Sequence, residues 1–403
     1  MESLLSFTLV VAIIVAAAKA AGYLSVRLKQ PAVLGELLIG LVLGPTLLNI
    51  LNWPLFGGGH LEEPIELMAH FGVLFLMFIA GLEVDLDTMF ETGRPAVLAG
   101  ALGVITPVIL GALAVLPFGF GIQEGVAIGL VLSATSVSIS AQTLIELGVL
   151  RSRVGMALLG AAIVDDILAI LLLSIFLALV AGGGGGAVGI VWVLVRMVLF
   201  LVLATLVGMR LIPRLASFVQ RLPISEGVMA LAVVITLFYA WSAEALGGVA
   251  AITGAFLAGL IFARTPTRRT IEAGMHTIAY SWLVPIFFVS IGLGIDARGL
   301  GWADLRLVLV FIVVAIISKI LGAGLGARLG GFTNRESLQL GAGMVSRGEV
   351  GLIVAAAEVE SGMLGDLVFT ELVLMVLATT LITPILLRAL FPEADRHPTP
   401  TSK

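Results

Sequence analysis

The chain has 403 residues, of which 60% are hydrophobic and 12% charged, and its formal net charge is −4 at pH 7. Soluble domains carry about 25% charged residues, so the composition excludes an ordinary soluble domain and indicates a protein that crosses a membrane many times. Apolar runs of about 20 residues predict spanning helices rather than the alternating strands of a barrel. The sequence contains no cysteine, which excludes disulfides, thiol catalysis and thiolate metal sites.

Thirteen hydrophobic segments follow one another, joined by short connections that carry Gly and Pro. They predict an all-α polytopic membrane protein with thirteen transmembrane helices and no soluble domain. The first segment has no basic stretch before it and no evident cleavage site, so we expect a retained span rather than a signal peptide. The approximate ranges are 4–27, 31–51, 65–86, 95–118, 124–146, 153–181, 188–212, 226–243, 248–264, 277–297, 303–327, 337–360 and 367–390.

The distribution of lysine and arginine predicts the orientation, because cytoplasmic loops are enriched in these residues. If the N-terminus is outside, all but two of the basic residues that lie between the predicted spans fall on the inner side. The two exceptions are Arg298 and Arg306. We therefore expect a multi-pass protein of the cell inner (plasma) membrane, with its N-terminus outside and its C-terminus in the cytoplasm.

Two pairs of short motifs indicate an internal repeat. Residues 75–85 in the third segment resemble residues 286–296 in the tenth, and residues 33–41 in the second resemble residues 252–260 in the ninth. Each pair is separated by seven segments, an odd number, so the two copies run in opposite directions. The pattern predicts two inverted six-helix repeats joined by the seventh segment as a linker helix. Transporters built this way bind their substrate near the middle of the membrane, between the repeats.

Two adjacent carboxylates, Asp165 and Asp166, lie in the middle of the sixth segment. A charge at the bilayer centre costs about 2.5–3.5 kcal/mol, so such residues are usually functional and usually have a partner. Neighbouring side chains on a helix point about 100° apart. We therefore expect one carboxylate to face a water-filled cavity and the other to be held by a countercharge. Lys319 is the expected countercharge, because it lies too deep in the eleventh segment for ordinary snorkelling.

The fifth and twelfth segments each have a polar or glycine-rich centre, at 133–140 and 341–351. This pattern is typical of discontinuous helices, whose exposed backbone groups coordinate ions. Ordinary packing of small residues in continuous helices is the alternative. Arg347 and Glu349 lie two apart and do not face each other on a regular helix, so we expect them to neutralise broken-helix ends or nearby carboxylates.

The remaining charges allow weaker predictions. Lys19 and Arg196 either snorkel or pair within a scaffold. Glu83, Asp85 and Asp87 cluster at the cytoplasmic end of the third segment, where they line a cation funnel or form a solvated helix end. The four histidines fall in or near loops, where a surface position is favoured over a pH-sensing role.

Taken together, these motifs resemble those of the monovalent cation:proton antiporters, and most closely the second, electrogenic branch. The resemblance covers nearly the whole chain. The residues that carry it are Gln30–Glu36, Ala134–Val137, Gly160–Asp166, Pro285–Phe288, Lys319 and Ser346–Ile353.

The resemblance implies the Na⁺/H⁺ antiporter fold, a homodimer and an elevator mechanism in which a core domain moves against a scaffold. Residues 1–92 and 223–300 are then the dimerisation scaffold, 93–182 and 301–392 the core transport domain, 183–222 the linker helix and 393–403 a cytoplasmic tail. It also implies that Asp166 carries the ion and the proton, that Asp165 pairs with Lys319, and that Asp166 and Asp165 are the ligands of the transported Na⁺. Thr135 and Ser136 then lie beside the site, where the broken helices cross.

The expected function is exchange of Na⁺, or Li⁺, for protons, with no catalytic residue, no cofactor and no nucleic-acid partner, and with membrane lipid around the chain. A carboxylate poised between burial and a countercharge holds either protons or a cation, and this competition forces exchange. The double aspartate favours an electrogenic exchange of two protons for one Na⁺.

Three alternatives remain. A K⁺/H⁺ antiporter or K⁺ efflux system of the same branch is the nearest. Glutathione-gated members usually have Gln-Asp in place of Asp165-Asp166 and a cytosolic domain, so we expect a different subgroup. An intramembrane aspartyl protease is disfavoured because its aspartates come from separate helices, and because Gly292–Asp296 has the wrong motif spacing. A sodium-coupled organic-anion symporter is disfavoured by the helix count and by Lys319.

Overall fold

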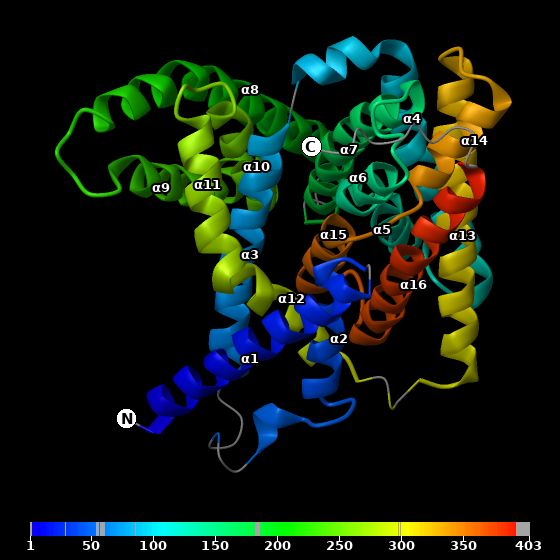
Figure 1. Ribbon diagram of the computed structural model, residues 1–403, viewed down its shortest axis with the longest axis horizontal. Helices are drawn as coiled ribbons and strands as arrows, with labels where there is room; N and C mark the ends of the chain where they lie inside the picture. Colours follow the sequence, from blue (N-terminus) through cyan, green and yellow to red (C-terminus); the bar gives the residue numbers. More distant parts are fainter. Residues whose placement is uncertain are drawn as a thin grey trace, which may run out of the picture. The chain divides into compact units, whose positions relative to one another are not determined.

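The computed structural model describes residues 2–28, 30–53, 56, 61–84, 86–181, 186–296, 298 and 300–391 (Figure 1). Within these residues nine helices are long and apolar enough to cross a membrane, which confirms an all-helical, multi-pass protein. The predicted total of thirteen spans stays a prediction. The nine helices cover Leu4–Arg27, Glu62–Glu83, Gly93–Phe118, Arg153–Val180, Val195–Val219, Gly227–Gly247, Arg268–Leu293, Trp302–Leu329 and Asp366–Leu390. Shorter apolar helices cover Ala32–Leu43, Ile122–Ser133 and Ala251–Phe262.

The chain divides into two compact units, and each unit combines a segment from the first half of the sequence with one from the second. Unit one is Met1–Asp85 with Ser174–Ala297, and unit two is Leu86–Leu173 with Arg298–Lys403. The long helix α7 (Arg153–Ala181) passes from unit two into unit one.

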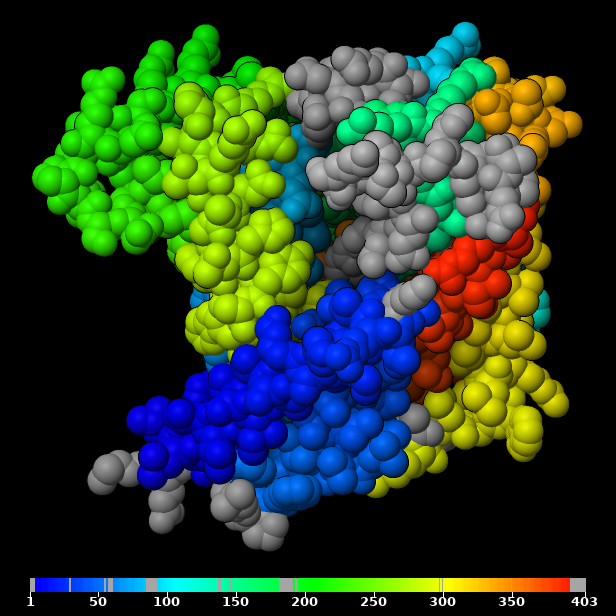
Figure 2. Space-filling model, in the orientation of Figure 1, coloured from blue at the N-terminus to red at the C-terminus, as the bar shows by residue number. Residues whose placement is uncertain are grey.

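Unit one is built around two pairs of packed helices, α2 with α12 and α3 with α10. Figure 2 shows part of its surface, where α1 in dark blue lies against helices of the same unit. Its helices are α1 (Glu2–Arg27), α2 (Ala32–Leu43), α3 (Glu62–Glu83), α8 (Gly186–Val219), α9 (Gly227–Ser242), α10 (Ala251–Phe262), α11 (Arg268–Ile278) and α12 (Val284–Leu293). A 3₁₀ turn covers Ile50–Asn52, and π-helical turns cover Ala243–Gly247 and Ala279–Leu283.

Glycines allow the backbones of these two pairs to touch. A Cβ at Gly40 of α2 would collide with the backbone of α12, and one at Gly292 of α12 would collide with the backbone of α2. The second pair repeats this arrangement, because a Cβ at Gly81 would meet α10 and one at Gly259 would meet α3. Small residues give membrane helices the close van der Waals contact that holds them together without a hydrophobic driving force.

Unit two contains the two segments predicted to be broken. Its helices are α4 (Leu86–Val115), α5 (Ile122–Ser133), α6 (Val137–Glu146), the first part of α7, α13 (Trp302–Leu329), α14 (Asn334–Gly343), α15 (Glu349–Glu360) and α16 (Asp366–Leu390), with a 3₁₀ turn at Leu116–Phe118. α4 and α13 pack closely, because Gly322 and Gly326 of α13 lie directly against the carbonyl oxygens of Leu102 and Leu98 of α4.

The start of α14 is fixed by a capping box, which allows a stability prediction. The backbone N–H of Thr333 donates to the Glu336 carboxylate at 2.8 Å, and the N–H of Glu336 donates to the Thr333 hydroxyl at 3.3 Å. The Thr333 backbone N–H lowers the pKa of Glu336 from its ordinary value of 4.5. The capping contribution is therefore complete at neutral pH and is lost as the pH falls below that ordinary value.

We expect Glu336→Gln to lower the thermal unfolding midpoint at pH 7. The difference in midpoint between the variant and wild type should become smaller towards pH 4. Thr333→Ala should cost about 1 kcal/mol of unfolding free energy. Thermal unfolding of the purified protein at both pH values measures this. A gap that is the same at pH 7 and pH 4 would contradict the role of the Glu336 charge.

Candidate functional site in unit two

Both predicted broken helices are broken in the structure. α5 ends at Ser133 and α6 begins at Val137, and α14 ends at Gly343 while α15 begins at Glu349. The prediction of discontinuous helices is confirmed, and the alternative of continuous small-residue helices is wrong for both segments. Residues 134–136 and 344–348 therefore present backbone groups that are not satisfied within a helix.

The two breaks are hydrogen-bonded to each other. The backbone N–H of Ser136 donates to the carbonyl oxygen of Ser346 at 2.9 Å, and the Ser346 hydroxyl donates back to the carbonyl of Ser136 at 2.7 Å. The Ser140 hydroxyl donates to the carbonyl of Gly343 at 2.5 Å. Backbone polar groups buried in a membrane need such partners, so the breaks stabilise each other where they meet. Sequence reasoning missed Ser140 and Ser346 as contacts between the two segments.

Gly348 lies at the tightest point of this contact, which allows a second prediction. A Cβ at Gly348 would approach the side chain of Ser136 to 2.7 Å. We expect Gly348→Ala to destabilise the protein by about 1–3 kcal/mol, the usual cost of overpacking. Ser136→Gly in the Gly348→Ala background removes the colliding atoms, so it should recover part of the loss. Thermal unfolding of the single and double variants tests this, and an unchanged unfolding midpoint for Gly348→Ala would contradict it.

Arg347 is completely buried where the two breaks meet. It binds carbonyl oxygens of α5, α13 and the second break. Its guanidinium donates to Leu132 at 2.6 Å, to Ala315 at 2.8 Å, and to Val345. Leu132 lies in the last turn of α5, where helix carbonyls carry partial negative charge. The structure thus places Arg347 at a broken-helix end. The side chain of Glu349 lies outside the described residues.

Asp165 and Lys319 form a buried ion pair between α7 and α13. The Lys319 Nζ atom lies 2.5 Å from the Asp165 Oδ1 atom, and both side chains are 0% exposed. Thr135, in the first break, donates its hydroxyl to the carbonyl oxygen of Met344 in the second break at 3.5 Å. On the α4 side, a Cβ at Gly103 would lie 3.6 Å from the Asp165 Oδ1 atom, so this helix closes directly over the pair. The predicted countercharge is therefore in contact with the first carboxylate.

Asp166 differs from its neighbour in burial. It is partly exposed, whereas Asp165 is fully buried, and the two side chains leave α7 in different directions. Asp166 is also close enough to Lys319 for electrostatic attraction. One carboxylate is thus engaged by a lysine in the interior, while the next one along the helix is more accessible. Of the other predicted site residues, Thr135 and Ser136 are buried at the crossing.

The remaining predicted residues lie in unit one. Glu83 ends α3 and contacts His276, a partner that sequence reasoning missed, while Asp85 lies outside the described residues. Lys19 and Arg196 both donate to backbone carbonyls within the unit: Lys19 to Tyr280 at 2.6 Å, and Arg196 to residues 245 and 246. Lys19 also faces the carboxylate of Glu36 at 3.8 Å.

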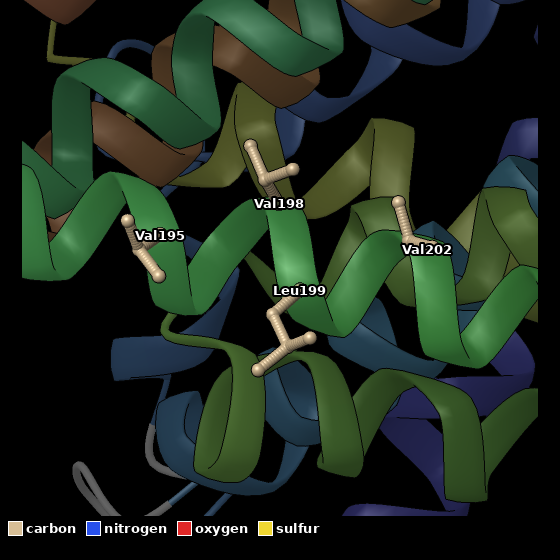
Figure 3. Close-up of a pocket in the computed structure, with 4 residues that line it drawn as sticks. All are labelled: Val195, Val198, Leu199 and Val202. Atoms are coloured by element: carbon tan, nitrogen blue, oxygen red, sulfur yellow. The ribbon is translucent and has the colours of Figure 1, made fainter.

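One pocket of unit one has no feature of an ion site. Figure 3 shows it on α8, lined by Val195, Val198, Leu199 and Val202. These apolar side chains offer no oxygen or nitrogen ligand, and each is about half exposed. Such a surface suits lipid chains rather than a cation.

Comparisons with known proteins identify a family and several relatives of this chain. Residues 10–392 match the family described as "Sodium/hydrogen exchanger, transmembrane". The chain is 39% identical over 387 residues to the Na⁺/H⁺-K⁺ antiporter GerN of Bacillus cereus, covering 96% of both chains. It is 31% identical over 384 residues to a Na⁺/H⁺ antiporter of Enterococcus hirae, covering 95% of this chain and 98% of the relative.

A solved structure shares the fold at much lower identity. The sodium proton antiporter MjNhaP1 of Methanocaldococcus jannaschii superposes with a TM-score of 0.71 over 96% of both chains, at 16% identity. The fold is thus shared with an antiporter, while the family match and the relatives at 31% and 39% identity extend along almost the whole sequence. This chain belongs to the sodium/hydrogen exchanger family.

Proposed function

We propose that this protein is a secondary transporter that exchanges a monovalent cation, Na⁺ or Li⁺, for protons across the membrane. The observation that carries the proposal is the Asp165–Lys319 pair with Asp166 beside it, next to two broken helices that meet. The names of the relatives, which are Na⁺/H⁺ or Na⁺/H⁺-K⁺ antiporters, support the same activity.

The mechanism follows from competition for carboxylate oxygens. Asp166 binds either a proton or a cation, and the hydroxyl of Thr135 and the backbone carbonyls of the breaks are the oxygen ligands that a small cation needs nearby. The second proton is released from the Asp165–Lys319 pair. When the site opens to one side at a time, cation binding displaces protons on that side. Two protons leaving for each Na⁺ make the exchange electrogenic, as expected for the second branch of the family.

Most of unit two is proposed as the moving transport domain, and most of unit one as the scaffold and linker, in an elevator mechanism within a homodimer. The scaffold would comprise residues 1–92 and 223–300, the transport domain 93–182 and 301–392, with 183–222 as the linker. The reciprocal glycine contacts, α2 with α12 and α3 with α10, support an inverted repeat, because an inverted pair of repeats exchanges partners in this way. The excess of basic residues on one side supports an outside N-terminus in the inner membrane.

Transport in proteoliposomes tests the proposed function. A pH-sensitive dye inside vesicles that hold a proton gradient should recover its fluorescence on addition of Na⁺ or Li⁺. K⁺ in the same assay tests the K⁺/H⁺ alternative. GerN is a Na⁺/H⁺-K⁺ antiporter, so K⁺ transport would be a second activity beside Na⁺ transport rather than a replacement for it. Vesicles in which no monovalent cation releases the gradient faster than in protein-free vesicles would contradict the proposal.

Charge movement tests the stoichiometry separately. We expect transient currents when Na⁺ is applied to protein adsorbed on a solid-supported membrane, because two protons move against one Na⁺. Active exchange without current would contradict the two-to-one ratio while leaving exchange itself intact.

A further inference from the structure

A second cluster of ionisable side chains lies in unit one, where α11 packs against the end of α3 (Figure 1). It consists of Glu83, Glu272 and His276, and their ligand atoms all lie within 4.8 Å of one another. His276 Nε2 is 2.9 Å from a carboxylate oxygen of Glu83. None of these residues contributes to the Asp165–Lys319 pair, which belongs to unit two.

The cluster has the composition of a transition-metal site. Imidazole nitrogen and carboxylate oxygen are both ligands of Zn²⁺, and three protein ligands leave the fourth position to water. With bonds of about 2.0–2.1 Å, ligand atoms around a tetrahedral zinc lie about 3.3 Å apart. The three ligand atoms now lie within 4.8 Å of one another. Side-chain rotations that move each atom by about an ångström therefore bring them to that geometry. Mg²⁺ and Ca²⁺ prefer oxygen ligands alone and do not need the imidazole.

The local structure holds two of the ligands ready on one helix. Glu272 and His276 are four residues apart on α11, so they share one face. The imidazole of His276 is stacked on the ring of Tyr280, with centroids 5.0 Å apart and an interplanar angle of 10°. This contact fixes the ring plane while Nε2 points at Glu83, and the fixed ring reduces the entropy lost on metal binding.

The charge around the third ligand favours a cation. Glu83 is the last residue of α3, and no basic residue lies in the last turn of that helix. The helix end carries partial negative charge and adds to the carboxylate charge. Arg268 competes for one ligand, because its guanidinium lies 3.9 Å from Glu272. This contact is exposed, and a metal ion can displace so weak an ion pair.

We propose that Glu83, Glu272 and His276 bind one divalent transition-metal ion of the Zn²⁺ class and thereby link α3 to α11. The ligands lie at the predicted cytoplasmic end of both helices and are partly exposed, so an ion in water reaches them directly. The site is independent of the proposed transport chemistry, and its test does not depend on transport.

Equilibrium titration of the purified, tag-free protein with Zn²⁺, in competition with a chromophoric chelator, tests the site. We expect one Zn²⁺ per chain and an affinity at least about tenfold lower in His276→Gln and in Glu272→Gln, since loss of supporting groups alone costs 10–100-fold. His70→Gln is the matched control on α3, and Asp166→Asn removes the proposed transport carboxylate. Both should bind Zn²⁺ as wild type does. X-ray absorption should show nitrogen and oxygen ligands, with imidazole scattering lost in His276→Gln.

Three outcomes would overturn the proposal: no stoichiometric Zn²⁺ binding, equal binding by wild type and both ligand variants (an adventitious ion only), or binding of Mg²⁺ and Ca²⁺ in preference to Zn²⁺. Circular dichroism in the presence of EDTA checks that each variant is folded. If one ligand variant fails this check, the other decides the result.

Discussion

Asp166→Asn is expected to abolish cation-driven proton movement in proteoliposomes. The amide keeps the shape of the side chain but neither binds a proton at physiological pH nor offers a negative charge to a cation, so both halves of the competition are lost. Asp166 is partly exposed, hence the substitution should leave the folded state nearly as stable as wild type. Dye dequenching by Na⁺, Li⁺ and K⁺ measures transport, and thermal unfolding of the same preparation measures stability.

Asp366→Asn is the matched control for this experiment. Asp366 lies in the first turn of α16 in the same unit and is exposed, so its substitution should leave transport close to wild type. Normal exchange by Asp166→Asn would show that the ion is carried elsewhere. Loss of exchange accompanied by unfolding would point to a structural role instead, and the parallel unfolding measurement separates these two results.

Lys319→Gln is expected to have the largest effect on stability. It leaves the Asp165 carboxylate in the protein interior without its lysine, and removing one partner of a buried ion pair typically costs about 3–5 kcal/mol. Transport should be impaired or lose its electrogenic character, because Asp165 no longer has the charge that regulates its proton. Thermal unfolding in detergent and solid-supported-membrane currents measure the two effects.

A double variant separates the charge from the packing. Asp165→Asn with Lys319→Gln removes both charges, so it should be more stable than Lys319→Gln alone, and the double-mutant cycle should show a coupling of more than 0.5 kcal/mol. Arg306→Gln is the control, because Arg306 is an exposed basic residue on the same helix, α13. If the changes in unfolding free energy caused by Asp165→Asn and Lys319→Gln simply added, the two side chains would not be energetically coupled.

The sequence predicted the buried charges and the two helix breaks of the candidate site better than the backbone groups that surround them. Charges inside apolar segments are rare and need partners, so depth alone predicted that Lys319 pairs with one of the two aspartates. The choice of Asp165 came from the resemblance to the antiporters. The polar centres of the fifth and twelfth segments likewise revealed the two breaks. Which of the available carbonyls Arg347 would bind was not accessible, because Leu132 and Ala315 come from segments far apart in the chain.

Helix ends at the membrane surface were predicted less well. The tenth segment was expected to begin near residue 277, but helical structure begins at Arg268 and continues through a π-helical turn. α11 is amphipathic and carries charges, so a search for apolar runs passes over it. The contact between Glu83 and His276 was missed for the same reason, since it depends on a helix that hydropathy does not detect and joins residues 193 positions apart.

The hydrogen bonds of Arg347 restrict how the site can become accessible first from one side of the membrane and then from the other. One guanidinium ties the end of α5, the second break and α13, and Ala315 on α13 is one turn from Lys319. Sliding one of these elements past another would break buried, charge-assisted hydrogen bonds worth about 1.5–3 kcal/mol each. We therefore expect α5, the second break and α13 to move as one rigid body that carries the bound cation and its carboxylates. Local separation of these elements is not expected to release the cation.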